Sequence, residues 1–192
     1  MKINPYQALF EQRDVVAITG LKTATLQNWA NRRIISLDKP SPGKAWKRLY
    51  SVLDIYKVAF LRAMGRLGLN PYDAAHFFIH IKDQIKKAYE EDNWNFGSWD
   101  YQMCLFICPD PSEEDKYISS HYYWSVRTGS FTSEPGTDGC IEQKLVNISL
   151  PESALFFKAS AFLSRIHSKI VDALEAKERR KRIFQSMIKK PK

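Results

Sequence analysis

The sequence lacks any apolar run approaching the roughly 18 residues that a membrane-spanning helix requires, so neither a membrane-spanning protein nor a membrane partner is expected. Its first residues also lack the apolar stretch of a secretory signal peptide. Only three cysteines occur in 192 residues. An odd number of cysteines without a secretory signal fits reduced thiols better than a disulfide framework. We therefore expect a cytoplasmic protein.

The motifs that usually mark an enzyme are missing as well. The sequence contains no glycine-rich phosphate loop, no nucleophile elbow, no HExxH motif and no evident pair of carboxylates. We therefore expect neither catalytic residues nor a bound cofactor. The chain can still bury a core, because 44% of its residues are hydrophobic and 13% are aromatic.

Cysteine and histidine positions give only weak candidates for a metal site. Cys104 and Cys108 are four residues apart, but Cys140 is distant and no further ligand stands at zinc spacing. His76 and His80 are one helical turn apart, and a site there would still need a carboxylate or a thiolate. We expect core thiols and a packed or solvated helix face rather than a bound metal.

Charge is distributed unevenly along the chain. Residues 1–90 carry 15 Lys and Arg against 7 Asp and Glu, a balance of +8. Residues 91–150 have a balance of −7, and residues 151–192 have a balance of +7. Basic ends around an acidic middle indicate that only part of the surface meets a polyanion.

Two short helices are predicted within residues 14–30. Val15 and Ile18, and then Leu26 and Trp29, have helical spacing. Gly20 stands between the two helices, where a sharp turn needs a residue that tolerates positive φ. Two short helices joined by a tight glycine turn are typical of a helix-turn-helix.

The polar side of the second predicted helix has side chains that can bind DNA. Such side chains donate to and accept from phosphates and base edges in the major groove. One of them, Thr23, is also predicted to cap the helix with its hydroxyl. The candidates are Lys22, Thr23, Thr25, Gln27 and Asn28.

A hairpin with several Pro and Gly residues follows at 39–50, and two further helices are predicted after it. Ser51 and Asp54 have the spacing of a capping box at the start of the first. Pro71 suits the first position of the second, predicted over 72–89. Within this second helix, helical spacing is found for Ala75, Phe78, Ile79, Lys82 and Ile85.

These segments together resemble the MerR family of transcription regulators over roughly the first 80 residues. The resemblance rests on an ordered series of motifs: a helix-turn-helix, a basic wing and the helix after the wing. The matching residues are Val15 to Leu21, Thr25, Leu26, Trp29, Arg32, Ile34 and Ile35 in the first, Lys44 to Ser51 in the second, and Asp54, Ile55, Leu61, Arg62 and Leu67 to Leu69 in the third.

The resemblance implies that the second helix enters the major groove while the wing contacts backbone and minor groove. It adds Arg32 to the helix candidates, and it implies that Arg48 touches the DNA backbone and that Tyr50 braces the hairpin. Cations near the hairpin tip suit phosphate contact, because each neutralised phosphate releases counterions. Trp46 could stack on a sugar or pack on the domain. The wing candidates are Lys44, Trp46, Lys47, Arg48 and Tyr50.

Two positions depart from the family pattern. The family often has an aromatic pair in the second helix, but Asn28 replaces the first aromatic and only Trp29 remains. Arg33 stands where family members commonly have glycine, at the helix end. The base preference of a relative is therefore not transferred to this chain.

Beyond residue 90 the composition favours strands. Segments at 100–107, 117–127 and 141–150 predict a small antiparallel sheet packed on helices. An aromatic group in this region could line a pocket for a small-molecule effector or form a small core. Its members are Trp94, Phe96, Trp99, Tyr101, Tyr122, Tyr123 and Trp124.

A long final helix is predicted to open at Pro151. Its apolar residues recur every three or four positions, which fits a coiled-coil seam. Family members dimerise through a helix after the DNA-binding domain, so we predict a homodimer contact here; the alternative is an amphipathic helix packed on its own sheet. The residues are Leu155, Ala159, Phe162, Ile166 and Ile170.

The expected fold is α+β, with a winged helix-turn-helix domain at 1–90 and an acidic, strand-containing segment plus a long helix at 91–192. The expected function is a transcription regulator that binds a pseudo-palindromic operator in double-stranded DNA as a homodimer. Two alternatives stay open: an excisionase-like factor that bends DNA, and a ligand-sensing module with secondary DNA contacts.

Overall fold

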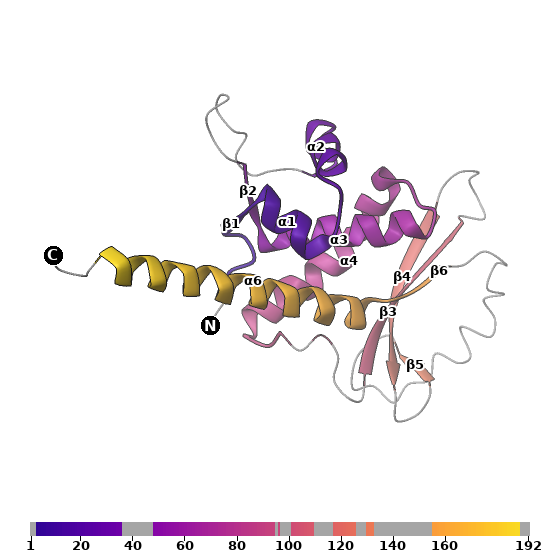
Figure 1. Ribbon diagram of the computed structural model, residues 1–192. Coiled ribbons are helices and arrows are strands. Elements are labelled where there is room, and N and C mark those ends of the chain that lie inside the picture. Colours follow the sequence, from indigo (N-terminus) through magenta and orange to yellow (C-terminus); the bar gives the residue numbers. More distant parts are fainter. Residues whose placement is uncertain are drawn as a thin grey trace.

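A computed structural model describes residues 3–35, 48–94, 96, 101–109, 117–125, 130–132 and 155–188. These residues form a mainly helical α+β fold with an N-terminal two-stranded sheet, a second sheet and a long C-terminal helix (Figure 1). Among the residues described, no helix has the length and apolar character needed to cross a membrane.

The N-terminal unit surrounds the short sheet with four helices. Strands β1 and β2 pair antiparallel, with Phe10 opposite Tyr50. The elements in order are β1 (Ala8–Glu11), α1 (Gln12–Thr19), α2 (Thr23–Asn31), β2 (Leu49–Ser51), α3 (Val52–Arg66) and α4 (Pro71–Glu90).

Local capping signals start α3 and α4, and both predictions are confirmed. The Ser51 amide donates to Asp54 Oδ2 at 2.8 Å, and the Asp54 amide donates to Ser51 Oγ at 3.1 Å. This reciprocal pair satisfies two donors that a helix N-terminus leaves open. Asn70 caps α4 by accepting from two amides of the first turn, and Pro71 occupies the first helical position.

The core of this unit lies around α3. Tyr56, Phe60 and Met64 on α3 are fully buried. The buried residues of α4 keep a helical period from Ala74 through Phe77, Phe78 and Ile81 to Ile85. The predicted apolar face of α4 was therefore wrong at Ile79, whose side chain is 54% exposed.

The second sheet is antiparallel with the order β5–β4–β3–β6. The predicted strands at 100–107 and 117–127 are confirmed as β3 and β4, while the one predicted at 141–150 lies outside the described residues. The strands are β3 (Tyr101–Pro109), β4 (Tyr117–Ser125), β5 (Ser130–Thr132) and β6 (Leu155–Lys158).

Helix α6 (Ala159–Ile188) follows β6 without an intervening residue. The prediction that this helix opens at Pro151 and includes Leu155 was wrong. Leu155 lies in β6, opposite Ile107 of β3. Tertiary pairing explains the difference. The Leu-Phe-Phe run of β6 pairs with β3 on the edge that β4 leaves open, and this pairing outweighs the local helical pattern.

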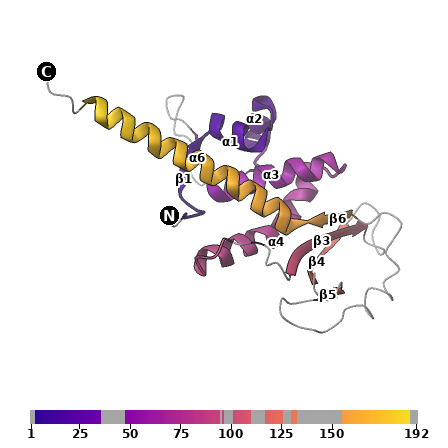
Figure 2. The same cartoon turned by 60° about the horizontal axis from the view of Figure 1, so that its bottom comes forward.

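Helix α6 crosses beneath α1 and α3 rather than standing apart from them (Figure 2). The ring centroids of Phe162 and Phe60 on α3 are 6.2 Å apart. Ala159, Phe162, Ile166 and Ile170 are all buried in one core with α1, α3 and α4. A dimer contact through these four side chains would first have to remove them from this core.

Candidate nucleic-acid interface

The turn between α1 and α2 is fixed by glycine geometry and by an arginine from α3. Gly20 ends α1 with φ of 66°, and its amide donates to the Val16 carbonyl at 2.8 Å. A Cβ at this position would lie 2.7 Å from Nη1 of Arg62. That same nitrogen donates to the Thr19 carbonyl. The left-handed φ favours glycine, and a Cβ at this position would require the Arg62 guanidinium to move.

Helix α2 is anchored on one side and displayed on the other. Leu26 and Trp29 are buried, at 0% and 8% exposure. In Figure 1, α2 stands at the edge of the molecule, on the side of α1 opposite to α6. Of the predicted DNA-contacting residues, Lys22, Thr23, Gln27, Asn28 and Arg32 are exposed and Thr25 is partly exposed.

The start of α2 offers backbone donors to an anion. The N-cap residue is Lys22, and no side chain caps the helix at this position. The prediction that Thr23 is the cap was wrong, because Thr23 is the first helical residue. A helix N-terminus without a side-chain cap favours a negatively charged ligand, because its first amides point outward and the helix dipole is positive there.

Helix α2 is followed by a residue in the left-handed conformation. Arg33 has a φ of 58°. Its amide donates to the Ala30 carbonyl at 3.2 Å, and the Ile34 amide donates to the Trp29 carbonyl at 3.0 Å. This pair of bonds is a Schellman motif, which usually places glycine at the left-handed position. Arg33 therefore occupies a backbone position that favours glycine.

The described part of the wing is its root. Arg48 is exposed and its Nη2 donates to Asn31 Oδ1 at 3.5 Å, which places this cation beside the end of α2. Tyr50 is fully buried and cannot contact DNA directly; burial also raises the pKa of its hydroxyl. This position agrees with a bracing role and removes Tyr50 from the direct contacts. Lys44, Trp46 and Lys47 lie outside the described residues.

The surface around α2 is electropositive. The described stretches 15–35 and 48–53 contain no Asp or Glu, whereas Lys22, Arg32, Arg33 and Arg48 are exposed on them. A surface with cations and polar side chains but no carboxylates attracts the phosphate backbone and leaves amide and hydroxyl groups to meet base edges.

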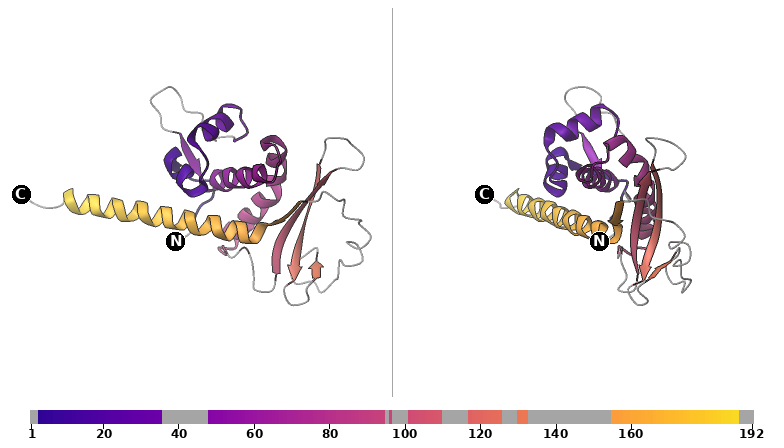
Figure 3. Two further views of the ribbon diagram at one scale, coloured as in Figure 1. Left: turned by 45° about the vertical axis from the view of Figure 1, so that its right-hand side comes forward. Right: turned by 90° about the vertical axis from the view of Figure 1, so that its right-hand side faces the viewer.

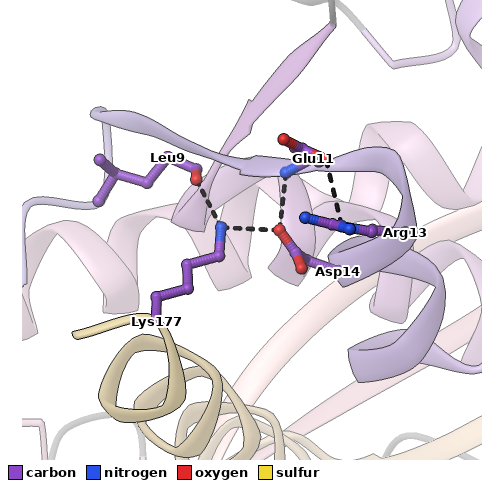
Figure 4. Close-up of polar contacts among 5 residues, drawn as sticks. All are labelled: Leu9, Glu11, Arg13, Asp14 and Lys177. Atoms are coloured by element: carbon purple, nitrogen blue, oxygen red, sulfur yellow. Dashed lines mark hydrogen bonds and ion pairs between the residues drawn. The ribbon is translucent and has the colours of Figure 1, made fainter. Parts of the chain in front are cut away.

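Helix α1 is held at its start by a residue from the far end of the chain. Lys177 Nζ lies 2.7 Å from Asp14 Oδ2 and donates to the Leu9 carbonyl at 2.7 Å (Figure 4). Asp14 also accepts from the Glu11 amide at 2.9 Å. Burial alone would raise the pKa of Asp14, but hydrogen bonds from Lys177 and the Glu11 amide outweigh it and hold the pKa below its usual value.

The opposite end of α1 is held by the same helix. Lys169 Nζ donates to the Ile18 carbonyl at 3.3 Å. Eight residues separate Lys169 from Lys177, about 12 Å along a helix, which is also the length of the eight-residue α1. Helix α6 therefore runs antiparallel to α1 and contacts both of its ends. Nothing local in the sequence connects residues 14 and 177, so sequence reasoning missed this pair.

The predicted aromatic group is divided by the structure. Trp94 stacks on His167 of α6 at 4.8 Å between ring centroids, and Phe96 packs edge-on against Tyr56 at 6.1 Å. The Tyr56 hydroxyl lies 3.0 Å from His167 Nδ1, and burial lowers the pKa of this histidine. These aromatics join α6 to α3. Tyr101, Tyr122, Tyr123 and Trp124 lie in β3 and β4, and Trp99 is outside the described residues.

In the part of the chain that the structure describes, no group of three or more His, Cys, Asp or Glu could hold a metal ion. His76 and His80 both lie on α4, and Cys104 and Cys108 both lie in β3. Cys140 falls outside the described ranges.

Comparison with known proteins adds no relative. No protein-family model matches the chain, and no curated protein matches it. The resemblance to MerR regulators therefore rests on the sequence motifs quoted above alone.

Proposed function

We propose that the chain is a MerR-like winged helix-turn-helix protein that binds double-stranded DNA at a specific sequence and regulates transcription. The observation that carries this proposal is the surface of α2. Its apolar side is buried through Leu26 and Trp29, and its displayed side has polar and basic residues without a carboxylate. A recognition helix needs this combination of a fixed back and a hydrogen-bonding front.

In the proposed complex, α2 lies in the major groove. Gln27 and Asn28 are exposed amides, which can bond adenine through two hydrogen bonds. The start of α2 with Lys22 on one side, and Arg48 at the wing root on the other, would contact phosphates that flank the bases. The phosphate contacts set the register, and the amides select the sequence.

The resemblance further implies a homodimer on a pseudo-palindromic operator. Two copies related by twofold symmetry would present two α2 helices about one turn of DNA apart, roughly 34 Å. Four of the five side chains predicted to form the dimer contact are buried within one chain, namely those of Ala159, Phe162, Ile166 and Ile170. In this proposal the dimer contact therefore uses another surface.

Selection of bound duplexes from a random library, followed by titration at several salt concentrations, tests the proposal. The full chain is expected to enrich one motif, and its affinity should fall steeply with salt. Arg48→Ala should reduce the slope of log affinity against log salt by about 0.9, the value for one phosphate contact. Arg66→Ala, at an exposed cation in the last turn of α3, is the matched control and should leave the slope unchanged.

Other outcomes of this experiment favour other functions. Cooperative coverage of DNA without an enriched motif would favour the excisionase-like architectural factor. Weak DNA binding together with a tight small-molecule complex would favour the ligand-sensing module. An affinity that is independent of salt would contradict the proposed use of α2 and the wing root.

A further inference from the structure

The second half of α6 extends past the rest of the described structure. Ile170 is the last fully buried residue of the helix, Lys177 is partly exposed, and every side chain from 178 to 187 is exposed. Figures 1 and 3 show this end projecting beyond β1 and α1. Ten residues span about 15 Å of helix, or nearly three turns, along which none of the described side chains is buried.

This projecting end has an apolar stripe. Ile183, Phe184 and Met187 are 53%, 65% and 69% exposed. Together with Arg180 they occupy positions i, i+3, i+4 and i+7, which lie on one face of a helix. Single exposed apolar residues are ordinary, but three large ones on adjacent turns form a contiguous patch of the kind that marks an interaction site.

The charge of the segment limits what can cover the stripe. Residues 178–188 contain four Lys and Arg, namely Arg179, Arg180, Lys181 and Arg182, against one acidic residue, Glu178. A second copy of α6 laid along this stripe, in either direction, would place these cations against each other. Like charges across an interface disfavour the pairing, whereas a negatively charged partner is attracted.

Two anionic partners other than a protein fit less well. A helix that lies on a membrane separates a charged face from an apolar one, but Arg180 lies between Ile183 and Phe184 around this helix. Nucleic-acid interfaces are strongly polar, and they would leave three large apolar side chains without a use. A protein groove accepts both kinds of residue, since helix-in-groove recognition uses anchors at i, i+3, i+4 and i+7.

We propose that residues 178–188 of α6 form a docking helix for a partner protein with an apolar groove rimmed by Asp and Glu. Ile183, Phe184 and Met187 enter the groove, and Arg180 and its neighbouring cations pair with the rim. Aromatic residues, Met and Arg are the types enriched at such interfaces. This surface lies on the opposite side of α1 from α2, so docking and DNA binding are separable (Figure 1).

Photo-crosslinking in the cells that naturally produce the chain tests this proposal. Benzoylphenylalanine replaces Phe184 in the full-length protein, and as a matched control it replaces Gln185, which is exposed about 100° further round the same turn. A partner protein should be captured from position 184 only. It is then purified and titrated with the wild-type chain, with Phe184→Asp and with Gln185→Asp.

The expected result is salt-dependent binding that Phe184→Asp weakens at least about tenfold, as for an anchor residue, while Gln185→Asp changes it less than about twofold. Both positions are exposed, so circular dichroism and operator binding should match the wild type. Equal capture at both positions, capture of neither, or an affinity that Phe184→Asp leaves unchanged would overturn the proposal.

Three further experiments would show that something other than the proposed partner protein covers the apolar stripe. Concentration-dependent sedimentation of the purified chain that Phe184→Asp abolishes would replace the proposal with self-association. Binding to phosphatidylglycerol vesicles that the same variant abolishes, without a captured protein, would replace it with a membrane. Loss of binding to a non-operator duplex in this variant would replace it with nucleic acid.

Discussion

Helices α1 and α2 are neighbours of similar length, yet they are held in different ways. Helix α1 is fixed at its start by Lys177 and at its end by Lys169, both from α6. Helix α2 depends on its own Leu26 and Trp29, and its other side is displayed. Long-range contacts therefore hold both ends of α1, whereas α2 is held by its own apolar side chains and most of its polar side chains stay exposed.

The difference predicts separable effects of substitution. Changes at the supports of α1 should lower the free energy of unfolding, and they should affect DNA binding only through the folded fraction. Changes on the outer side of α2 should alter DNA recognition and leave the free energy of unfolding within about 0.5 kcal/mol of wild type, as for other surface positions.

The largest effect is expected from Gly20→Ala. The new methyl group would meet the Arg62 guanidinium, and alanine would be forced into a left-handed conformation. The conformation costs about 1–2 kcal/mol and the lost bond to the Thr19 carbonyl about 1 kcal/mol more, so destabilisation should be about 3 kcal/mol. Urea unfolding measures it. Gly65→Ala is the control, because a Cβ there meets nothing within 4 Å. Equal effects at both glycines would contradict the close approach of Arg62.

Recognition by α2 is addressed by Gln27→Ala and Asn28→Ala. A side-chain amide bonded to adenine contributes about 1–3 kcal/mol of discrimination, so each variant should lose preference at one operator position. Competitive titration against single-base variants of the operator measures this loss, and thermal unfolding should not change. A uniform loss of affinity for all sequences would instead assign both residues to phosphate contact.

The attachment of α1 to α6 is addressed by Lys177→Met. Methionine keeps much of the side-chain volume but leaves the Asp14 carboxylate and the Leu9 carbonyl without their donor. Loss of a charged hydrogen bond at a partly buried site should cost about 1–2 kcal/mol, or roughly 2–8 °C in melting temperature. Lys181→Met, four residues further along the exposed part of the helix, should change the melting temperature by less than about 2 °C, because surface substitutions usually change stability by no more than about 0.5 kcal/mol.

The same contact predicts a dependence on pH. The folded-state pKa of Asp14 lies below its unfolded value of about 4. Its stabilisation is therefore fully present above that unfolded value and is lost as the pH falls through the folded value. Wild type should be more stable than Asp14→Asn at pH 7, and the difference should shrink at pH 3. A difference that grows on acidification would reverse the assigned direction.

The smallest effect, and the only gain, is expected from Arg33→Gly. Glycine removes the cost of a left-handed residue, although it also gives the unfolded chain more freedom, so the net gain should be about 0.5–1 kcal/mol. Calorimetry should show a modest rise in melting temperature. Arg32→Gly is the matched control, because Arg32 has a φ of −81° and should gain nothing.

Local chemistry made much of the N-terminal unit predictable. The Gly20 turn, the Ser51–Asp54 capping box and the Pro71 helix start each depend on residues within one turn of one another. The side chains displayed on α2 were predictable for the same reason, since the period of Leu26 and Trp29 determines which residues face outward.

Contacts between distant segments were not predictable. The period of α4 was misjudged at Ile79 because neighbouring apolar residues allow two phases, and packing against α3 selects between them. Leu155 continues the helical spacing of the following sequence, yet it lies in strand β6, which pairs with β3. The pairing of Asp14 with Lys177 has no signal in either local sequence, because it exists only after α6 has docked.

That docking also sets an order in time. The Leu9 carbonyl accepts a hydrogen bond from Lys177, which is synthesised 168 residues later in the chain. At about 5–20 residues per second, synthesis takes on the order of ten seconds to proceed from the end of α4 to Lys177. During that interval Phe60 and the other core residues that pack against α6 lack this contact. The newly made N-terminal unit therefore completes its packing only after Lys177 has been synthesised, and a synthesis interrupted before α6 would release a chain whose α1 is held at neither end by this helix.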